Sequence, residues 1–217
     1  MRYFRKDLRA LNETSAINLE SAFESLKVLY DEVDRRNERN TRDLNLPCSQ
    51  GCSSCCEESV FLTPLEFLYA WDFLQKNVED SQLDDIIDKG LALYQEHRDL
   101  IDAFEKPPPH GEKDHVSIHL QLRFRCPLLS AQGTCRVYPA REILGRLFGS
   151  SFNSEGGVYG CHLVGAHLGG QNVTLIRARP MAQRIHNLPL SDKQQVYPFY
   201  IHQLYGKTRV RLPIALE

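Results

Sequence analysis

The spacing of the cysteines is the feature that most limits how this chain can fold. Four of the seven cysteines fall within nine residues, and the other three lie far downstream. They are Cys48, Cys52, Cys55, Cys56, Cys126, Cys135 and Cys161. An odd number of thiols cannot pair completely as internal disulfides, and thiols at such short spacings are typical of metal ligands. The pattern therefore predicts a folded metal site to which separate segments of the chain contribute.

Length and composition place the chain among ordinary globular proteins. At 217 residues it can bury roughly 70% of the surface of its unfolded chain, so it does not need a metal simply to fold. The net charge of -2 gives no general reason to bind nucleic acid or an anionic membrane. No stretch approaches the ~20 consecutive apolar residues of a membrane-spanning helix. We therefore expect a cytoplasmic protein, in which cysteines remain reduced.

Hydrophobic periodicity predicts several amphipathic helices. Apolar residues recur at three- and four-residue steps between residues 12 and 43, and Thr14 or Ser15 can cap the start of this helix. The pair Thr63-Pro64 marks a second start, because threonine can cap a helix and proline suits its first turn. The predicted helices are 12–43, 64–75, 81–104 with Ser81 as cap, 139–148 ended by Gly149, and 191–205 bent or broken at Pro198.

Short strands and loops complete the predicted architecture. Residues 158–163 and 173–176 are β-branched enough to be strands, and 207–211 alternates like a charged edge strand. The proline-rich stretch 107–111 predicts an exposed loop. We predict a mainly helical α+β fold, with helices around a cysteine-rich metal site and a few short strands. We predict a single domain over residues 1–217, with the helix 12–43 as an extension of it.

Thiolate chemistry narrows the choice of metal. Thiolate is a soft ligand that suits zinc and iron-sulfur clusters rather than magnesium or calcium. Both zinc and a cluster are commonly held by four cysteines, so seven thiols exceed one ordinary site. The surplus thiols could be free, could hold a second ion, or could belong to a bridged centre. We prefer an iron-sulfur cluster, with zinc as the alternative, because the spacing of the first cysteines and the surplus thiols suit a cluster.

The local geometry of residues 48–56 has two readings. In a helix, Cys48, Cys52 and Cys55 would fall on one stripe at i, i+4 and i+7. If Gly51 instead forms a tight loop, successive backbone N–H groups can point at the sulfurs. Both readings favour an ion or a cluster.

The order of the motifs resembles the YkgJ-like cysteine-cluster family, whose members are described as zinc- or iron-chelating proteins. The resemblance is carried by the 48–56 run, by Cys126-Pro127-Leu128-Leu129 and by Gly133-Thr134-Cys135-Arg136-Val137-Tyr138 with Arg141 and Arg146 after it. It implies metal ligands among these cysteines. The family continues with an Arg-Pro pair and a Cys-Arg pair, where this chain has Arg141-Glu142 and Gly145-Arg146. Gly145 thus stands where a ligand is expected, and Cys161 is the other source of that thiolate.

Two further resemblances suggest an enzyme. The spacing Cys48-x3-Cys52-x2-Cys55 is similar to the cluster motif of radical S-adenosylmethionine enzymes, in which three cysteines leave one iron open. Against this, Ser54 replaces an aromatic residue and no repeated strand-helix units follow. The cysteine-cluster family is also similar to cluster-containing methyltransferases that modify flagellin lysines. No glycine-rich nucleotide loop supports either reading.

Histidines near the cysteines are weaker candidates for metal ligands, and arginines near them are weaker candidates for groups that support the site. His115 and His119 are four residues apart and could form a metal pair, but a solvated strand-loop is the simpler reading. His162 and His167 flank Cys161 and a glycine-rich turn and could complete a coordination sphere, but core histidines are the simpler reading. Arginine can hydrogen-bond a metal-bound sulfur, bind an anion or face water. The arginines around the second cysteine region are Arg123, Arg125, Arg136, Arg141 and Arg146.

The sequence thus predicts a metal-binding protein whose cysteines, the seven named above, hold an iron-sulfur cluster or zinc. A cluster-dependent protein-modifying or redox role is one option. The alternative is a structural zinc module that mediates protein-protein interaction. We expect a protein partner, and neither nucleic acid nor membrane.

Overall fold

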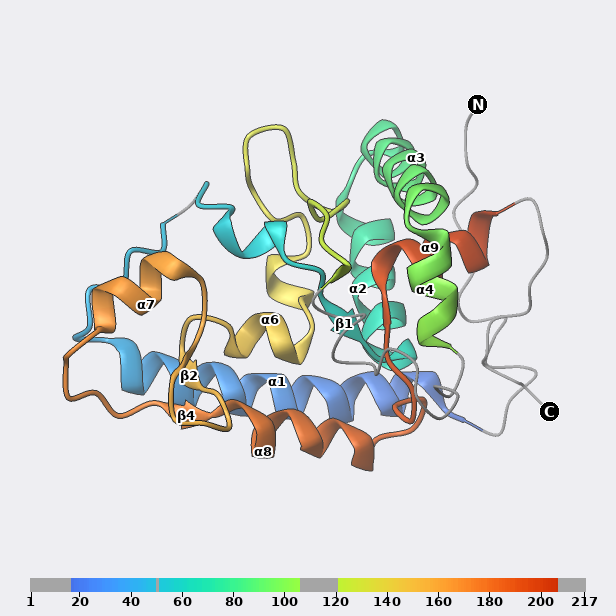
Figure 1. Ribbon diagram of the computed structural model, residues 1–217. Coiled ribbons are helices and arrows are strands. Elements are labelled where there is room, and N and C mark those ends of the chain that lie inside the picture. The colour runs from blue at the N-terminus through green and yellow to red at the C-terminus, as the bar shows by residue number, and fades with distance from the viewer. Residues whose placement is uncertain (1–16, 50, 106–120, 207–217) are drawn as a thin grey trace.

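The computed structural model describes residues 17–49, 51–105 and 121–206, which form a mainly helical structure with short strands (Figure 1). The predicted loop 107–111, His115, His119 and the predicted strand 207–211 lie outside these ranges. The longer helices are α1 (Leu19–Thr41), α2 (Pro64–Asn77), α3 (Asp80–Glu96) and α9 (Tyr197–Tyr205). The shorter helices are α4 (Arg98–Phe104), α6 (Ile143–Leu147), α7 (His162–Leu168) and α8 (Ala178–Gln183), with 3-10 turns η2 (Ser54–Glu57), η3 (Tyr138–Ala140) and η4 (Arg184–Asn187).

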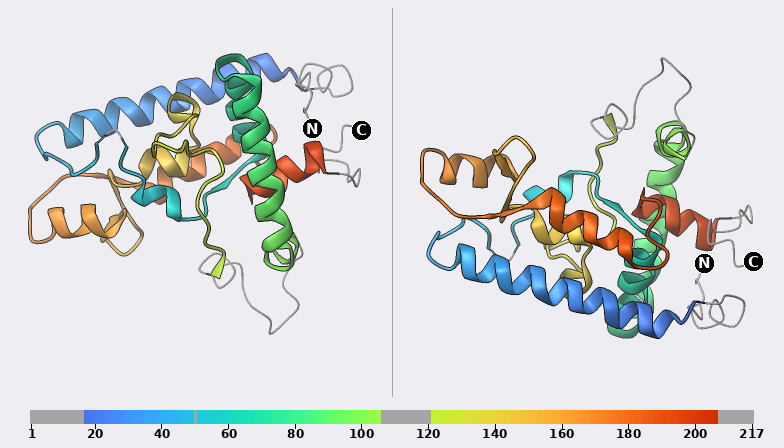
Figure 2. Two further views of the ribbon diagram at one scale, coloured as in Figure 1. Left: turned by 90° about the horizontal axis from the view of Figure 1, so that it is seen from above. Right: turned by 90° about the horizontal axis from the view of Figure 1, so that it is seen from below.

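Helix α1 runs along one side of the molecule, and α6 and the turn η4 that follows α8 contact it (Figures 1 and 2). It begins at Leu19, later than the predicted start at residue 12, because the side chain of Asn18 caps it by accepting a hydrogen bond from the Ser21 N–H at 3.0 Å. Thr14 and Ser15, the predicted caps, lie outside the described residues. One face of α1 is buried, including Leu26, Tyr30 and Val33. The predicted amphipathic helix is therefore confirmed, but not its start.

The other helix boundaries follow local chemistry. Thr63 and Glu66 form the reciprocal capping box that starts α2, as the Thr63-Pro64 pair predicted. The predicted helix 81–104 is instead two helices, α3 and α4, which meet at the non-helical residue His97. Pro198 lies in the first turn of α9 and starts that helix, so the predicted bend within 191–205 is wrong.

The strands are shorter than predicted. Strand β1 (Phe61–Leu62) pairs antiparallel with β5 (Gln195–Val196). In a second sheet, β2 (Ser151–Phe152) lies between antiparallel β3 (Val158–Tyr159) and parallel β4 (Ile176–Arg177). The predicted strand 158–163 ends at Tyr159, because α7 begins at His162. Of the predicted strand 173–176, only Ile176 is in a strand.

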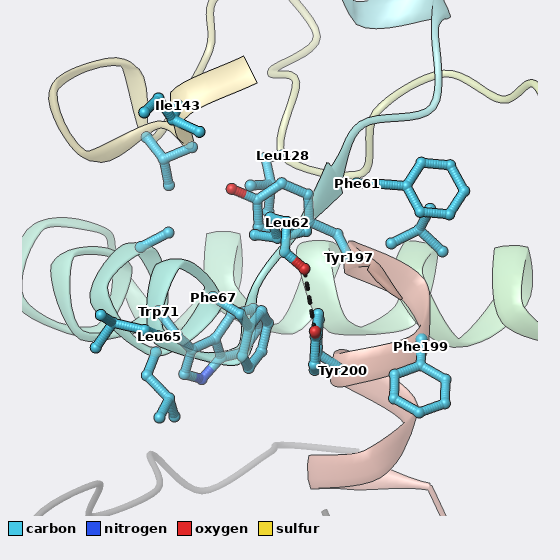
Figure 3. Packing of buried hydrophobic residues seen from close by; sticks show 14 of the residues in the cluster. Phe61, Leu62, Leu65, Phe67, Trp71, Leu128, Ile143, Tyr197, Phe199 and Tyr200 are labelled. Atoms are coloured by element: carbon cyan, nitrogen blue, oxygen red, sulfur yellow. Dashed lines mark hydrogen bonds between the residues drawn. The ribbon is translucent and has the colours of Figure 1, made fainter. Parts of the chain in front are cut away.

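The main core lies between α2, α9 and the β1–β5 pair (Figure 3). Phe67 of α2 stacks on Trp71 and on Tyr200 of α9, with ring centroids 5.4 and 4.7 Å apart. The Tyr200 hydroxyl donates to the Leu62 carbonyl at 3.1 Å. Leu128 and Ile143, which belong to the cysteine-bearing segment, are fully buried in this same core. The candidate site is thus anchored directly to the hydrophobic core. No helix among the described residues is long and apolar enough to cross a membrane.

A buried arginine connects α1 to the segment that follows Cys135. The side chain of Arg146 is only 4% exposed, and its guanidinium lies 4.0 Å from the centre of the Tyr30 ring. It donates to the carbonyls of Pro139 at 2.6 Å and Arg141 at 2.8 Å, and pairs with Asp34 of α1. Since a planar guanidinium can satisfy all these acceptors at once, Arg146 fixes the path of residues 139–146. Arg146 is therefore a structural residue. The sequence alone left open that it faces water, but its side chain is buried.

A buried carboxyl performs the same task from α2. Glu66 is 1% exposed and accepts four hydrogen bonds. They come from the Tyr30 hydroxyl, the Ile143 N–H, and the N–H and hydroxyl of Thr63. Burial raises the pKa of Glu66 to about 7, although its hydrogen bonds from the Ile143 and Thr63 N–H groups oppose the rise. Glu66 thus joins α1, α2 and the start of α6.

We predict that Glu66 makes stability depend on pH. Its pKa is about 7 in the folded protein against its usual 4.5, so the folded protein binds more protons than the unfolded chain between these values. The unfolding free energy should therefore fall as pH rises through this window, by up to about 3 kcal/mol. Urea unfolding of wild type and Glu66→Gln at pH 5, 6, 7 and 8 measures this, because other titrating groups cancel in the comparison. Equal slopes for the two proteins would contradict it.

We also predict that Arg146→Lys destabilises the protein by about 2–4 kcal/mol, because lysine cannot satisfy the buried acceptors together. Arg184→Lys is the matched control. Arg184 forms a surface ion pair with Glu32 at 2.8 Å, and the expected loss there is under about 1 kcal/mol. Thermal and urea unfolding of both variants make the comparison. Similar losses in the two variants would show that Arg146 has no special structural role.

Candidate metal centre

The cysteine run forms a loop that ends in the 3-10 turn η2, not an α-helix. The Cys52 N–H donates to the Ser49 carbonyl at 3.0 Å, and the Cys56 N–H to the Ser53 carbonyl at 2.8 Å. Gly51 has a φ of +89°, in the left-handed region that favours glycine. The helical stripe considered for residues 48–56 is therefore not formed, and the tight-loop reading agrees with the structure.

A second loop, residues 126–135, packs against the first. The Cys126 N–H donates to the Cys56 carbonyl at 2.7 Å, and Cys135 forms an isolated antiparallel bridge with Leu129. At the other end of the loop, a β-carbon on Gly133 would lie only 2.9 Å from the Gly51 carbonyl oxygen. Gly133 also has a positive φ, +76°. The close approach of the two cysteine loops thus requires glycine at this position.

The backbone N–H groups of Leu128 and Val137 each favour a thiolate of the second loop. The Leu128 N–H acts to lower the pKa of Cys126, and the Val137 N–H acts to lower that of Cys135, against the larger effect of burial. In both cases the N–H lies two residues after the cysteine. Such N–H groups suit a sulfur that binds a metal.

Four thiols from the two loops form an inner group, defined here as Cys55, Cys56, Cys126 and Cys135. The thiols of Cys126 and Cys135 interact electrostatically with those of Cys55 and Cys56. A hydrogen bond from Cys56 lowers the pKa of Cys55 to about 6, and the same bond, with burial, raises the pKa of Cys56. Burial also raises the pKa of Cys126, and that of Cys135 to about 11. The group therefore combines a favoured thiolate with thiols that burial keeps protonated in the absence of a cation.

The remaining thiols form an outer group, defined as Cys48, Cys52 and Cys161. Burial raises the pKa of Cys48, and the thiols of Cys161, Cys52 and Cys55 add to this rise. Cys161 precedes α7 and packs against a separate small cluster of apolar side chains. Cys55 interacts with members of both groups. The electrostatic influence of Cys55 thus extends to thiols of both groups.

Several predicted neighbours of the site have other roles. His167 contacts the Leu44 carbonyl at 2.7 Å through Nε2, and His162 is exposed at the start of α7. Arg123 and Arg125 pair with Glu58 and Glu57 at the surface. The described contacts of His167, Arg123 and Arg125 are therefore with groups other than the thiols, and His162 is exposed.

Arg141 and Glu142 act electrostatically on the thiols. The charge of Arg141 helps to lower the pKa of Cys55 and opposes the rise in the pKa of Cys48 and Cys135 that burial causes. Glu142, which sequence reasoning did not single out, interacts with Cys55, Cys126 and Cys135. The signal that could have identified Glu142 is its position in Arg141-Glu142, where the chain departs from the Arg-Pro pair of the family motif.

The thiols are not arranged as a coordination sphere among the described residues. Within residues 17–49, 51–105 and 121–206, no group of three or more His, Cys, Asp or Glu side chains is arranged to hold a metal ion. The sulfurs are near enough to interact electrostatically, so a metal would have to draw them together. Which cysteines are ligands thus stays a prediction.

Comparison with known proteins found no match among family models, curated proteins or solved structures. The likeness to the YkgJ-like family therefore rests on the motif residues alone.

We predict that Gly133→Ala opens the contact between the two cysteine loops. Gly170→Ala is the matched control, because Gly170 has the same positive φ, +77°, but a β-carbon there meets nothing within 4 Å. In the control, backbone strain alone should lower the free energy of unfolding, by about 1–2 kcal/mol. Gly133→Ala should lower it further, because its β-carbon also meets the Gly51 carbonyl. Urea unfolding of the metal-free protein measures both. An equal loss in the two variants would contradict the proposed contact.

Proposed function

We propose that this protein binds a metal centre through its clustered cysteines, preferably an iron-sulfur cluster and otherwise zinc. The observation that supports the proposal is the contact between the loops 48–56 and 126–135, together with the electrostatic interactions among the inner-group thiols. A set of thiols alone suits soft metals.

The inner and outer groups of thiols suggest an explanation for the surplus of cysteines. Cys55 interacts with both the inner and the outer group, so a bridged centre, or two centres that share Cys55, accounts for all seven cysteines. One zinc ion or one iron-sulfur cluster needs only four ligands, so the surplus of thiols favours a bridged or second centre over a single simple site.

Metal binding would couple to the final arrangement of the loops. Because the thiols are near one another but not arranged as ligands, part of the binding free energy would be spent on closing the loops, and metal loss would loosen them. The core residues Leu128 and Ile143 limit this movement to the loops themselves, since both are fully buried.

A structural zinc module that binds a protein partner is the second candidate. Tyr138 follows Cys135 closely in the chain and is 60% exposed, with the Arg141 guanidinium 4.3 Å from its ring centre. Exposed aromatic and arginine side chains are enriched in protein interfaces. This surface would place a partner directly beside the metal.

Anaerobic purification followed by metal and sulfide analysis distinguishes the candidates. We expect iron, acid-labile sulfide and a broad visible absorption. Stoichiometric zinc in a colourless protein would instead support the structural module. Cys135→Ser should lose inner-group metal, while Cys161→Ser should retain it. A protein that binds neither metal, both as purified and after anaerobic reconstitution, would overturn the proposed function.

A further inference from the structure

A groove of about 510 Å³ lies between the later part of α1 and strand β4, which contact each other (Figure 1). Its lining residues are Glu32, Arg35, Arg36, Arg39 and Asn40 of α1 and Ile176 of β4. Residues three and four apart on a helix are neighbours, so the lining residues from α1 form one continuous side of that helix. Within the part of the chain that the structure describes, no cysteine lines this groove. The groove is therefore separate from the candidate metal centre.

Positive charge exceeds negative charge along the groove. Three guanidinium groups line it, whereas its only carboxylate among the described residues is that of Glu32. This carboxylate is shared by two ion pairs, with Arg36 at 2.8 Å and with Arg184 of η4 at 2.8 Å. Among residues 17–49, 51–105 and 121–206, Arg35 and Arg39 form no ion pair. Two guanidinium groups thus lie in the groove without a counter-charge.

The spacing of these two arginines works against the helix that carries them. Arg35 and Arg39 are one turn apart, and like charges at this spacing destabilise a helix. Elsewhere on α1, Lys27 instead pairs with Asp31 at 2.7 Å across one turn. The helix dipole favours Arg39, which is in the last turn, but it gives no such support to Arg35. An anion bound between the two guanidinium groups would remove their repulsion.

The chemistry of the groove suits phosphate. A guanidinium group donates two parallel hydrogen bonds to phosphate oxygens, and it stays charged at any physiological pH. Two such groups on successive helix turns can hold two linked phosphates. The groove also has room for more than the phosphates, since its volume lies within the roughly 300–1,000 Å³ of small-molecule sites. The side chains of Asn40 and Ile176 offer a polar and an apolar contact to the rest of such a ligand.

A nucleic acid is the less favoured phosphate ligand. Its binding requires a row of basic side chains that follows many phosphates. The groove instead holds two guanidinium groups without partners among the described residues, and the carboxylate of Glu32 lies beside them. The net charge of the chain, -2, also gives no general attraction to a polyanion. The groove therefore fits a small ligand better.

We propose that this groove binds a small molecule that carries a diphosphate group, with Arg35 and Arg39 donating to the phosphate oxygens. Inorganic pyrophosphate and a nucleoside diphosphate share this chemistry. Glu32 keeps Arg36 and Arg184 in ion pairs, so it limits how many guanidinium groups reach the ligand. The proposal is independent of the metal-binding function, because the groove and the cysteine loops share no residue.

Isothermal titration calorimetry of the full-length protein at physiological ionic strength, with inorganic pyrophosphate and with ADP, tests the proposal. Wild type is compared with Arg35→Gln/Arg39→Gln and with Glu32→Gln. The matched control is Lys76→Gln/Arg98→Gln, which removes the same charge from surface ion pairs outside the groove. Every protein in the set keeps all its cysteines, so any effect of the ligands on a bound metal is common to all of them.

We expect Arg35→Gln/Arg39→Gln to bind both diphosphates at least about ten-fold more weakly, because it removes two charge-assisted donors. The control should change the affinity by less than about two-fold, since exposed charges outside the site are screened by salt. Glu32→Gln should bind about two-fold more tightly or better, because it releases Arg36 to the ligand. A gain of affinity cannot come from a damaged fold. Tighter binding of ADP would support a nucleoside diphosphate as the ligand, and tighter binding of pyrophosphate would support the inorganic ion.

An unchanged affinity in Arg35→Gln/Arg39→Gln would overturn the proposal. An equal loss in the matched control would also overturn it, because the attraction would then be to overall charge alone. Failure of wild type to bind either diphosphate would have the same consequence. A short single-stranded DNA that binds more tightly than both, and that loses affinity in Arg35→Gln/Arg39→Gln, would show a nucleic-acid surface and overturn the small-molecule assignment. Each of these outcomes leaves the proposed metal-binding function intact.

Discussion

The buried guanidinium of Arg146 is the contact on which the candidate site depends most. It holds the carbonyls of Pro139 and Arg141 while pairing with Asp34 of α1, so it sets the path of the chain between Cys135 and α6. Glu66 fixes the next residue of this path through the Ile143 N–H at 2.7 Å. These polar contacts lie over a core that includes Leu128. Together they give the cysteine loops a rigid base, as a functional site requires.

Much of the fold could be predicted from local signals in the sequence. The Thr63-Pro64 pair gave the start of α2 correctly, because its capping box involves neighbouring residues only. Periodicity could not locate the break at His97, since α3 and α4 continue one apolar pattern. It also could not separate β3 from α7, because short apolar runs suit either a strand or a helix. Those boundaries depend on tertiary packing.

The candidate site was only partly predictable for a related reason. The cysteine spacing indicated that distant loops contribute thiols, and the structure does bring 48–56 and 126–135 into contact. The division of the thiols around Cys55, and the position of Glu142 beside Gly145, involve residues whose contacts are set by the folded backbone. Arg146 illustrates the limit best, because an arginine near cysteines suggested a charge facing sulfur or water, and burial instead makes it structural.

X-ray absorption at the metal edge of the anaerobically loaded protein tests the central claim most directly, because it measures the atoms bound to the metal. The account predicts a dominant sulfur shell, at about 2.3 Å if the metal is zinc. A first shell of oxygen and nitrogen alone would show that the cysteines do not bind the metal, and would contradict the account.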